Sequence, residues 1–320
     1  MSRFLTTAFY HFVDLPAYQD LQSPIQEFCD QHDIKGTILL ASEGINGTLS
    51  AQDPSILAFH EYIKTDALFN GKFKALSHKE SIASSNPFYR MKVRLKKEIV
   101  ALGVPGISPT KKVGQYVKPQ DWNALISDPD TIIIDTRNGY EVDIGTFKGA
   151  INPKTETFRE FPGYVDRELL THKGKKIAMF CTGGIRCEKA TSLMLEKGFD
   201  EVYHLQGGIL KYLEEVPKEE SLWQGECFVF DQRVAVTHNL EEGDYDQCYA
   251  CRHPLSPNEM ASEEYIPGIS CPYCFNKLSP EKKASVGERQ KQMLLAKARG
   301  EPHIGKLIPK MNKQEAKKNG

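Results

Sequence analysis

The sequence predicts a multidomain protein that combines the α/β and α+β classes. Its 320 residues set a prior of two to three domains. In the first hundred residues strand and helix signals alternate in the order βαββαβ, further on apolar strands alternate with helices, and two Cys-x2-Cys pairs follow. With 40% hydrophobic and 26% charged residues, the composition excludes collagen-like, coiled-coil and wholly disordered chains. No apolar run approaches the ~18 residues that a membrane span requires.

The first domain, residues 1–102, is predicted to have a ferredoxin-like, or acylphosphatase-like, fold. Strands and helices are expected, in βαββαβ order, at Ala8 to Val13, Leu21 to His32, Thr37 to Ala41, Gly47 to Leu49, Pro54 to Leu68 and Arg90 to Lys96. The two middle strands flank the turn from Glu43 to Gly47, whose glycines and asparagine suit positive φ angles. This order is the split βαβ arrangement.

The last of these strands carries four cations on one face. Arg90, Lys92, Arg94 and Lys96 alternate with apolar residues at the strand period of two. Such a row is costly in mutual repulsion unless a polyanion such as RNA lies across it. The alternative is an edge strand whose cations prevent aggregation. The net charge of −1 does not exclude RNA, because residues 276–320 carry a net charge of +8 and the rest of the chain −9.

Residues 103–118 mix proline, glycine, serine and lysine without an apolar period, which is typical of a linker. Residues 119–217 are predicted to form a doubly wound parallel-sheet domain, because apolar strands alternate with helical segments. One strand, Ile177 to Phe180, leads directly into Cys181. Ligands of such sheets bind beyond the carboxyl ends of the strands. Cys181 therefore lies where a ligand is expected.

The segment after this strand turns directly into a helix. Gly183 and Gly184 let successive N–H groups point inward, and the helix start adds positive potential. With Arg186 near by, Cys181 is expected to be a nucleophilic thiolate; the alternative is a buried structural cysteine. The Cys-x4-Arg spacing is one residue shorter than the phosphate loop of cysteine phosphatases and fits a sulfur-sized group. The predicted active-site loop comprises Cys181, Thr182, Gly183, Gly184, Ile185 and Arg186.

Several motifs in residues 119–217 resemble those of the rhodanese family: Asp135-Thr136-Arg137, Glu141, Gly149 to Asn152, the Cys181 loop, Gly198-Phe199 and Leu205 to Gly208. The resemblance implies that Cys181 carries a persulfide, and that Asp135 and Arg137 form a buried pair that supports the active site. Cys187 could be a second thiol that resolves a persulfide or sulfenate. It could equally face the interior of the domain.

Residues 218–280 are predicted to form a small metal-binding module. Two Cys-x2-Cys pairs, 19 residues apart, supply Cys248, Cys251, Cys271 and Cys274, a spacing typical of a structural zinc site. The N-terminus has no signal-peptide core, so we expect the protein in the cytoplasm, where disulfides are disfavoured. Residues 281–320 are a basic tail, with a helix expected from Glu288 to Arg299 and a lysine-rich end beyond Lys306. The tail could bind RNA or remain solvated.

The motifs taken together resemble one family from near the N-terminus to about residue 280, the bacterial rhodanese-domain tRNA uridine-34 hydroxylases. The segments that carry this resemblance are Glu43 to Thr48, Phe88 to Arg94, Cys181 to Lys189, Cys227 to Val236 and the paired cysteines. It implies an oxidoreductase that uses molecular oxygen as co-substrate to form 5-hydroxyuridine at the wobble position, with Cys181 essential. The partner would be the anticodon arm of tRNA, with no membrane involved.

No other cofactor is predicted. The sequence has no Gly-x-Gly-x-x-Gly fingerprint for a flavin or a nicotinamide. The pair His78-x-Glu80 is interpreted as a chance occurrence rather than as part of a 2-His-1-carboxylate iron site. Two other functions stay open at this point. One is a sulfurtransferase that passes persulfide sulfur from Cys181 to a thiol acceptor, and the other is a non-catalytic RNA-binding adaptor.

Overall fold

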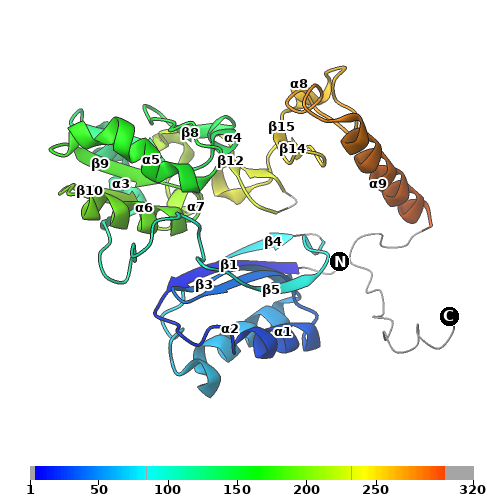
Figure 1. The fold of residues 1–320 in the computed structure, drawn as a ribbon, viewed down its shortest axis with the longest axis horizontal. Helices are drawn as coiled ribbons and strands as arrows, with labels where there is room; N and C mark the ends of the chain where they lie inside the picture. The colour runs from blue at the N-terminus through cyan, green and yellow to red at the C-terminus, as the bar shows by residue number, and fades with distance from the viewer. Residues whose placement is uncertain (1–3, 84, 232, 300–320) are drawn as a thin grey trace. The chain divides into compact units, whose positions relative to one another are not determined.

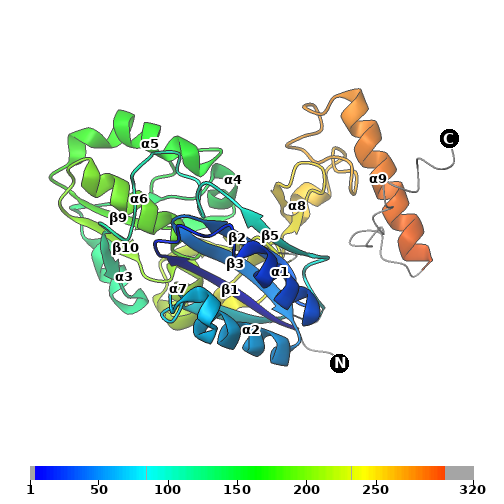
Figure 2. The same cartoon turned by 60° about the horizontal axis from the view of Figure 1, so that its bottom comes forward.

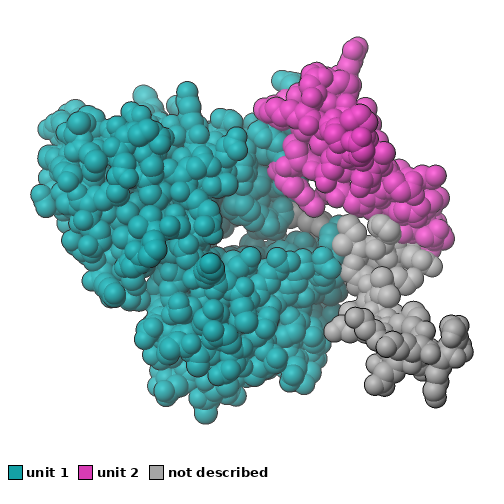
Figure 3. Space-filling model, in the orientation of Figure 1, with its two compact units in different colours: residues 1–247, 253–258 teal, residues 248–252, 259–320 magenta. Residues whose placement is uncertain are grey.

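The computed structural model describes residues 4–83, 85–231 and 233–299, which divide between two compact units (Figure 3). Unit 1 comprises residues 1–247 and 253–258, and unit 2 comprises residues 248–252 and 259–320. Unit 1 contains the two large sheets, each in its own domain. Within the described ranges, no helix has both the length and the apolar character needed to cross a membrane.

The N-terminal domain is a five-stranded sheet with two helices on one face (Figures 1 and 2). Its strand order is β4-β1-β3-β2-β5. Buried Ile38, Ile45 and Phe59 lie in the core between sheet and helices. The elements are β1 (Phe4–Phe12), α1 (Gln22–Gln31), β2 (Lys35–Ala41), β3 (Gly44–Ala51), α2 (Asp53–Thr65), the 3-10 helix η1 (Ala67–Phe69), β4 (His78–Ala83) and β5 (Met91–Leu95). The predicted ferredoxin-like fold is confirmed.

The prediction of the last strand of this fold was wrong. The strand that completes the βαββαβ order is β4, which pairs antiparallel with β1, whereas the basic strand β5 is a fifth strand, parallel to β2 at the opposite edge. The sequence of β4, His-Lys-Glu-Ser-Ile-Ala, contains only one large apolar residue, so it has no hydrophobic pattern to recognise. Its pairing with β1 makes it a strand.

The two faces of this sheet differ, and we call the one without helices the open face. Strand register places Lys92 beside Thr37 and Arg94 beside Leu39, in cross-strand rows that continue through β3 to β1. These rows reach Tyr10 of β1 and, through Ala8, Lys79 of β4. Neighbouring strands lie about 4.8 Å apart, so each row spans roughly 15–20 Å. The open face thus carries cations at both edges.

The second domain of unit 1 is built on a parallel sheet with the order β6-β10-β9-β7. Helices α5 and α6 pack against one face of the sheet and form one hydrophobic core. Helices α3 and α7 pack against the other face and form a second core, which confirms the doubly wound arrangement. Its elements are β6 (Gln115–Val117), α3 (Pro119–Ser127), β7 (Thr131–Asp135), α4 (Gly139–Val142), β8 (Gly145–Phe147), η2 (Phe158–Glu160), α5 (Phe161–Tyr164), η3 (Val165–Leu169), η4 (Leu170–His172), β9 (Lys176–Phe180), α6 (Ile185–Glu196), β10 (Val202–Leu205), α7 (Gly208–Glu215) and η5 (Lys218–Glu220).

The segment read as a linker contributes to this domain. β6 lies within residues 103–118 and pairs with β10, and Leu102 is buried in the core beside α6. A three-residue strand is too short to show a period, which explains why the sequence did not reveal it. The division of the chain into five parts remains a prediction.

The remaining elements are short apart from one helix. In unit 1, β11 pairs with β8 of the second domain, and Trp223, Cys227 and Val229 join its core. The helix expected from Glu288 to Arg299 lies within α9 up to Ala298, and the lysine-rich end beyond Lys306 lies outside the described residues. The elements are β11 (Trp223–Gly225), β12 (Cys227–Phe228), β13 (Ala235–Val236), η6 (His238–Leu240), β14 (Asp246–Gln247), β15 (Pro254–Leu255), α8 (Pro257–Met260) and α9 (Pro280–Ala298).

Candidate active site and metal centre

Cys181 lies at the carboxyl end of β9, in the turn that leads into α6. Its Sγ accepts a hydrogen bond from the Gly184 N–H over 3.1 Å. Gly184 has a φ of 104°, in the left-handed region, and the helix begins at the next residue. A glycine is needed here for two reasons. This φ is unfavourable for residues with a side chain, and a Cβ on Gly184 would lie 2.8 Å from the Tyr10 hydroxyl. The loop therefore has the inward-facing N–H arrangement that the sequence predicts.

The electrostatic environment favours the thiolate form of Cys181. Burial would raise its pKa, but this effect is outweighed by a hydrogen bond with the Cys187 thiol, by the charge of Arg186, and by backbone N–H donors. The pKa of Cys181 is consequently lowered from its ordinary value. A thiolate is the nucleophilic form of cysteine, so the loop can support covalent chemistry at this sulfur.

Arg186 is held in place by a buried carboxylate. Its two terminal nitrogens donate to the two carboxylate oxygens of Glu141 over 2.7 and 2.8 Å, and Glu141 is fully buried. Glu141 also closes the capping box at the start of α4, accepting from the Asn138 N–H. The arginine therefore acts on Cys181 through its charge, while its terminal nitrogens donate to Glu141 and, over 3.3 Å, to the Thr182 hydroxyl. Thr182, Gly183 and Ile185 are the other residues of the predicted loop.

Asp135 and Arg137 form a buried pair at the end of β7. The Arg137 Nε and Nη2 atoms donate to the two Asp135 oxygens over 2.9 and 2.6 Å, and neither side chain is exposed. Arg137 also donates to the Gly145 carbonyl and lies over the Trp223 ring, 5.2 Å from its centroid. These contacts fit the supporting role that the resemblance implies, and that role stays a prediction.

Cys187 faces the interior and contacts the reactive sulfur at the same time. It is fully buried on α6, and its Sγ lies 3.5 Å from the Thr136 hydroxyl. Burial and the neighbouring Cys181 thiolate raise its pKa, so Cys187 stays a protonated thiol that donates to Cys181. Cys187 therefore faces the interior and contacts Cys181, and its role as a second, resolving thiol stays a prediction.

Two residues of the N-terminal domain reach this site and were missed by sequence reasoning. The Tyr10 hydroxyl donates to Glu188 on α6 over 2.8 Å. The Lys79 ammonium donates to the carbonyl of Gly207 and interacts electrostatically with Cys181. Burial lowers the pKa of Lys79 to about 8, although the negative charge of Cys181 partly offsets this. Both residues come from the open face of the first sheet, and no local motif marks them.

A buried lysine joins α6 to the N-terminal domain. The Lys189 ammonium pairs with Glu43 at 2.9 Å and also with Glu98, and it is almost fully buried. Glu43 begins the turn motif between β2 and β3, so this motif of the first domain serves the contact with the Cys181 helix. Arg90 and Lys96, at the ends of β5, are exposed together with Arg94, whereas Lys92 is half-buried.

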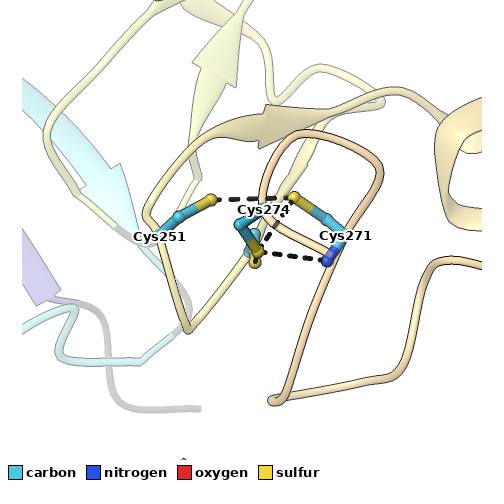
Figure 4. A group of neighbouring side chains, drawn as sticks. Cys251, Cys271 and Cys274 are labelled. Atoms are coloured by element: carbon cyan, nitrogen blue, oxygen red, sulfur yellow. Dashed lines mark hydrogen bonds between the residues drawn. The ribbon is translucent and has the colours of Figure 1, made fainter. Parts of the chain in front are cut away.

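The four paired cysteines converge in unit 2. Figure 4 labels three of them, Cys251, Cys271 and Cys274. All four sulfurs lie within 4.8 Å of one another, and the measured separations are 3.9 Å for Cys248 and Cys274, 3.6 Å for Cys251 and Cys271, and 3.7 Å for Cys271 and Cys274. Zinc–sulfur bonds of about 2.3 Å give a tetrahedron with edges of about 3.8 Å. The cluster therefore fits a tetrahedral metal ion without rearrangement.

Two sequence families match parts of the chain. Residues 4–99 match the UPF0176 acylphosphatase like domain, and residues 118–215 match the Rhodanese-like domain. A protein of Teredinibacter turnerae named tRNA uridine(34) hydroxylase is 56% identical over 305 residues, which cover 95% of this chain and 94% of the relative. The chain belongs to the tRNA uridine(34) hydroxylase family.

A second relative agrees with this membership. It has the same name, comes from Agrobacterium fabrum and is 56% identical over 303 residues, 95% of each chain. Among solved structures, a rhodanese-like domain from Anabaena sp. is 18% identical, with a TM-score of 0.29, over 34% of this chain and 78% of that one. Membership in the hydroxylase family favours a hydroxylase over a sulfurtransferase.

Proposed function

We propose that this protein is an oxygen-dependent oxidoreductase that converts uridine 34 of tRNA to 5-hydroxyuridine. The name of its relatives supplies the substrate. The observation that carries the proposal is the environment of Cys181, a thiolate stabilised by backbone donors and by Arg186 at the carboxyl end of β9. We place the reaction in the cytoplasm, where tRNA is found.

The first chemical step is addition of the Cys181 thiolate to C6 of uracil. The new S–C6 bond pushes an electron pair into the ring, so that C5 becomes electron-rich. The adduct carries negative charge. The Lys79 ammonium interacts electrostatically with Cys181 and can stabilise this charge. C5 can then bond to one atom of dioxygen, and the proton of the Cys187 thiol passes to the outer oxygen, which gives a C5 hydroperoxide and a Cys187 thiolate.

The second oxygen atom must be reduced, and the two thiols hold the electrons for this step. Attack of the Cys187 sulfur on the outer oxygen leaves a hydroxyl on C5 and a sulfenic acid on Cys187. Loss of the C5 proton and of the Cys181 thiolate then restores the ring double bond. Condensation of the two sulfurs gives a disulfide and water, so uridine, dioxygen and two thiols yield 5-hydroxyuridine, water and a disulfide. An external thiol regenerates the pair.

The tRNA is proposed to lie on the open face. Phosphates would contact Arg90, Lys92, Arg94 and Lys96 at the β5 edge, while the wobble base is splayed toward Cys181. Phe230 offers a stacking surface for that base, because its ring is 65% exposed and lies 6.0 Å from the Arg186 guanidinium carbon. We also propose that the four-cysteine cluster holds zinc, which supplies structural stability because all four positions are taken by protein ligands.

The test is a reaction of the purified chain with unmodified tRNA under isotopically labelled dioxygen. Mass spectrometry of the nucleosides should show 5-hydroxyuridine that carries one labelled oxygen atom, and a Cys181→Ser variant should form none. In the absence of external thiol, the wild type should make about one product per chain and acquire a disulfide, whereas Cys187→Ser should not complete even this turnover. Product containing oxygen from water, or normal activity of Cys181→Ser, would overturn the proposal.

The sulfurtransferase alternative is separated by a simpler assay. Thiosulfate and cyanide are mixed with the protein, and thiocyanate release is measured. Rapid release that depends on Cys181, together with absent hydroxylation of tRNA, would favour the transferase. Slow or absent release alongside labelled 5-hydroxyuridine supports the hydroxylase.

A further inference from the structure

Outside the Cys181 site and the four cysteines, one cluster of potential metal ligands occurs in the described residues. His60 on α2 and His78 and Glu80 on β4 each place one ligand atom within 4.8 Å of the other two. His60 Nε2 and His78 Nε2 lie 3.8 and 3.4 Å from Glu80 Oε1. The sequence places only His78 and Glu80 near each other, and helix α2 brings the third residue from 18 positions earlier.

The distances match a first-row metal ion. Bonds of about 2.1 Å to nitrogen and oxygen give tetrahedral ligand separations of about 3.4 Å. One measured separation equals this value and the other exceeds it by a few tenths of an ångström. The two imidazoles stack with centroids 3.8 Å apart and planes 23° from parallel. Because an imidazole lone pair lies in the plane of its ring, one ring has to rotate for both Nε2 atoms to bind the same ion.

The three side chains are ligand types that first-row divalent metal ions accept. Imidazole nitrogens and carboxylate oxygens bind zinc and the metals near it in the series. An imidazole binds a metal through the lone pair of a neutral ring.

The site is built into the fold and open on one side. His60 is 7% exposed, and its Nε2 also lies 3.1 Å from the buried Thr7 hydroxyl of β1. His78 and Glu80 are 29% and 36% exposed, so water can reach the remaining coordination positions. Side chains alternate along a strand, so Lys79, between these two ligands, points to the open face and contacts Gly207. The cluster is thus separated from Cys181 by the sheet itself.

We propose that His60, His78 and Glu80 bind one divalent first-row transition metal ion through two imidazoles and a carboxylate, with its other positions open to water. The ion would fasten the edge strand β4 to helix α2. It would thereby hold in place the strand whose other face presents Lys79 to the Cys181 loop. It would not contact the uridine, because it lies on the helix-covered face of the sheet.

The test uses the full chain with its four-cysteine site already filled by zinc, to which cobalt(II) is added. Cobalt at a nitrogen and oxygen site gives weak visible bands, whereas cobalt on thiolates gives intense sulfur-to-metal charge transfer, so the spectra tell the two sites apart. We expect one additional cobalt ion per chain with only the weak bands. In His78→Gln and in Glu80→Gln its affinity should fall at least about 10-fold.

Glu61→Gln is the matched control, because Glu61 is an exposed carboxylate on the same helix as His60. It should bind cobalt as the wild type does. Since His78 and Glu80 are partly exposed, their variants should keep the fold, which circular dichroism verifies. Cobalt and zinc should also raise the melting temperature of the wild type and not that of Glu80→Gln. If the wild type takes up no cobalt beyond the thiolate site, or if both variants bind it as tightly, the proposal is wrong.

Discussion

The molecule uses cysteine in two regions with opposite outcomes. At the carboxyl end of β9, a single thiolate is surrounded by backbone N–H groups, a thiol donor and the charge of Arg186. In unit 2, four sulfurs lie within 4.8 Å of one another. The first arrangement stabilises one negative charge on a single sulfur, while the second gathers several sulfurs around a position that a metal ion fits. The neighbours, and not the cysteine itself, decide between nucleophile and ligand.

The largest effect is expected from Cys181→Ser. Without the thiolate no covalent adduct can form, and hydroxylation of tRNA should fall by at least about 10³-fold. The metal content of the variant should equal that of the wild type. Cys29→Ala serves as a control, because Cys29 is buried in the N-terminal core and not in the core that contains Cys181. If Cys181→Ser still hydroxylates tRNA, Cys181 is not the nucleophile, and the contrast between a reactive cysteine and metal-binding cysteines is wrong.

Cys271→Ser should give the reverse pattern. Loss of one of four thiolates weakens zinc binding, which we expect to fall about 10²-fold or more because metal and folding free energies are coupled in such modules. Elemental analysis and the thermal unfolding of unit 2 measure this. Alkylation of Cys181 by iodoacetamide should keep its rate. A slowed alkylation of Cys181 in this variant would show that the two sites are not independent.

A smaller effect is expected at the basic strand. Replacing Lys92 and Arg94 by serine should weaken tRNA binding about 10-fold at low salt and reduce the salt dependence by roughly one unit of slope for each lost phosphate contact. Lys74→Ser, an exposed cation outside the open face, is the matched control. Filter binding across a salt series provides the data. If the salt dependence of binding keeps its slope, the cations of β5 do not contact phosphates and instead protect the edge of the sheet from aggregation.

The smallest effect concerns the charge beside Cys181. The lowered pKa of Cys181 means that its alkylation rate stays constant through neutral pH and falls only as the pH falls through that lowered pKa. Arg186→Lys keeps one charge but loses the paired contact with Glu141, so the midpoint should move upward by about one pH unit, equivalent to about 1.4 kcal/mol. Alkylation rates measured across pH test this. A midpoint that does not move would leave the Cys187 thiol and the backbone donors as the causes of the lowered pKa.

Much of the fold and part of the site could be predicted because their signals are local. Ile177 to Phe180 form an apolar run of strand length, and Gly183 and Gly184 mark the turn after Cys181. The spacing of the four cysteines identifies their cluster. β4 and β6 escaped prediction because one is mostly polar and the other has three residues, so their pairing partners, and not their own sequences, make them strands.

The sequence by itself determined the family, the position of the Cys181 loop and the four-cysteine cluster, since each depends on residues within a short stretch or on fixed spacings. Only the tertiary structure decided which distant residues surround them. It brought Tyr10 and Lys79 to the Cys181 loop, and His60 to the pair of His78 and Glu80. The physical reason is that strand register and helix packing join positions far apart in the chain, and no local pattern records which pairs will meet.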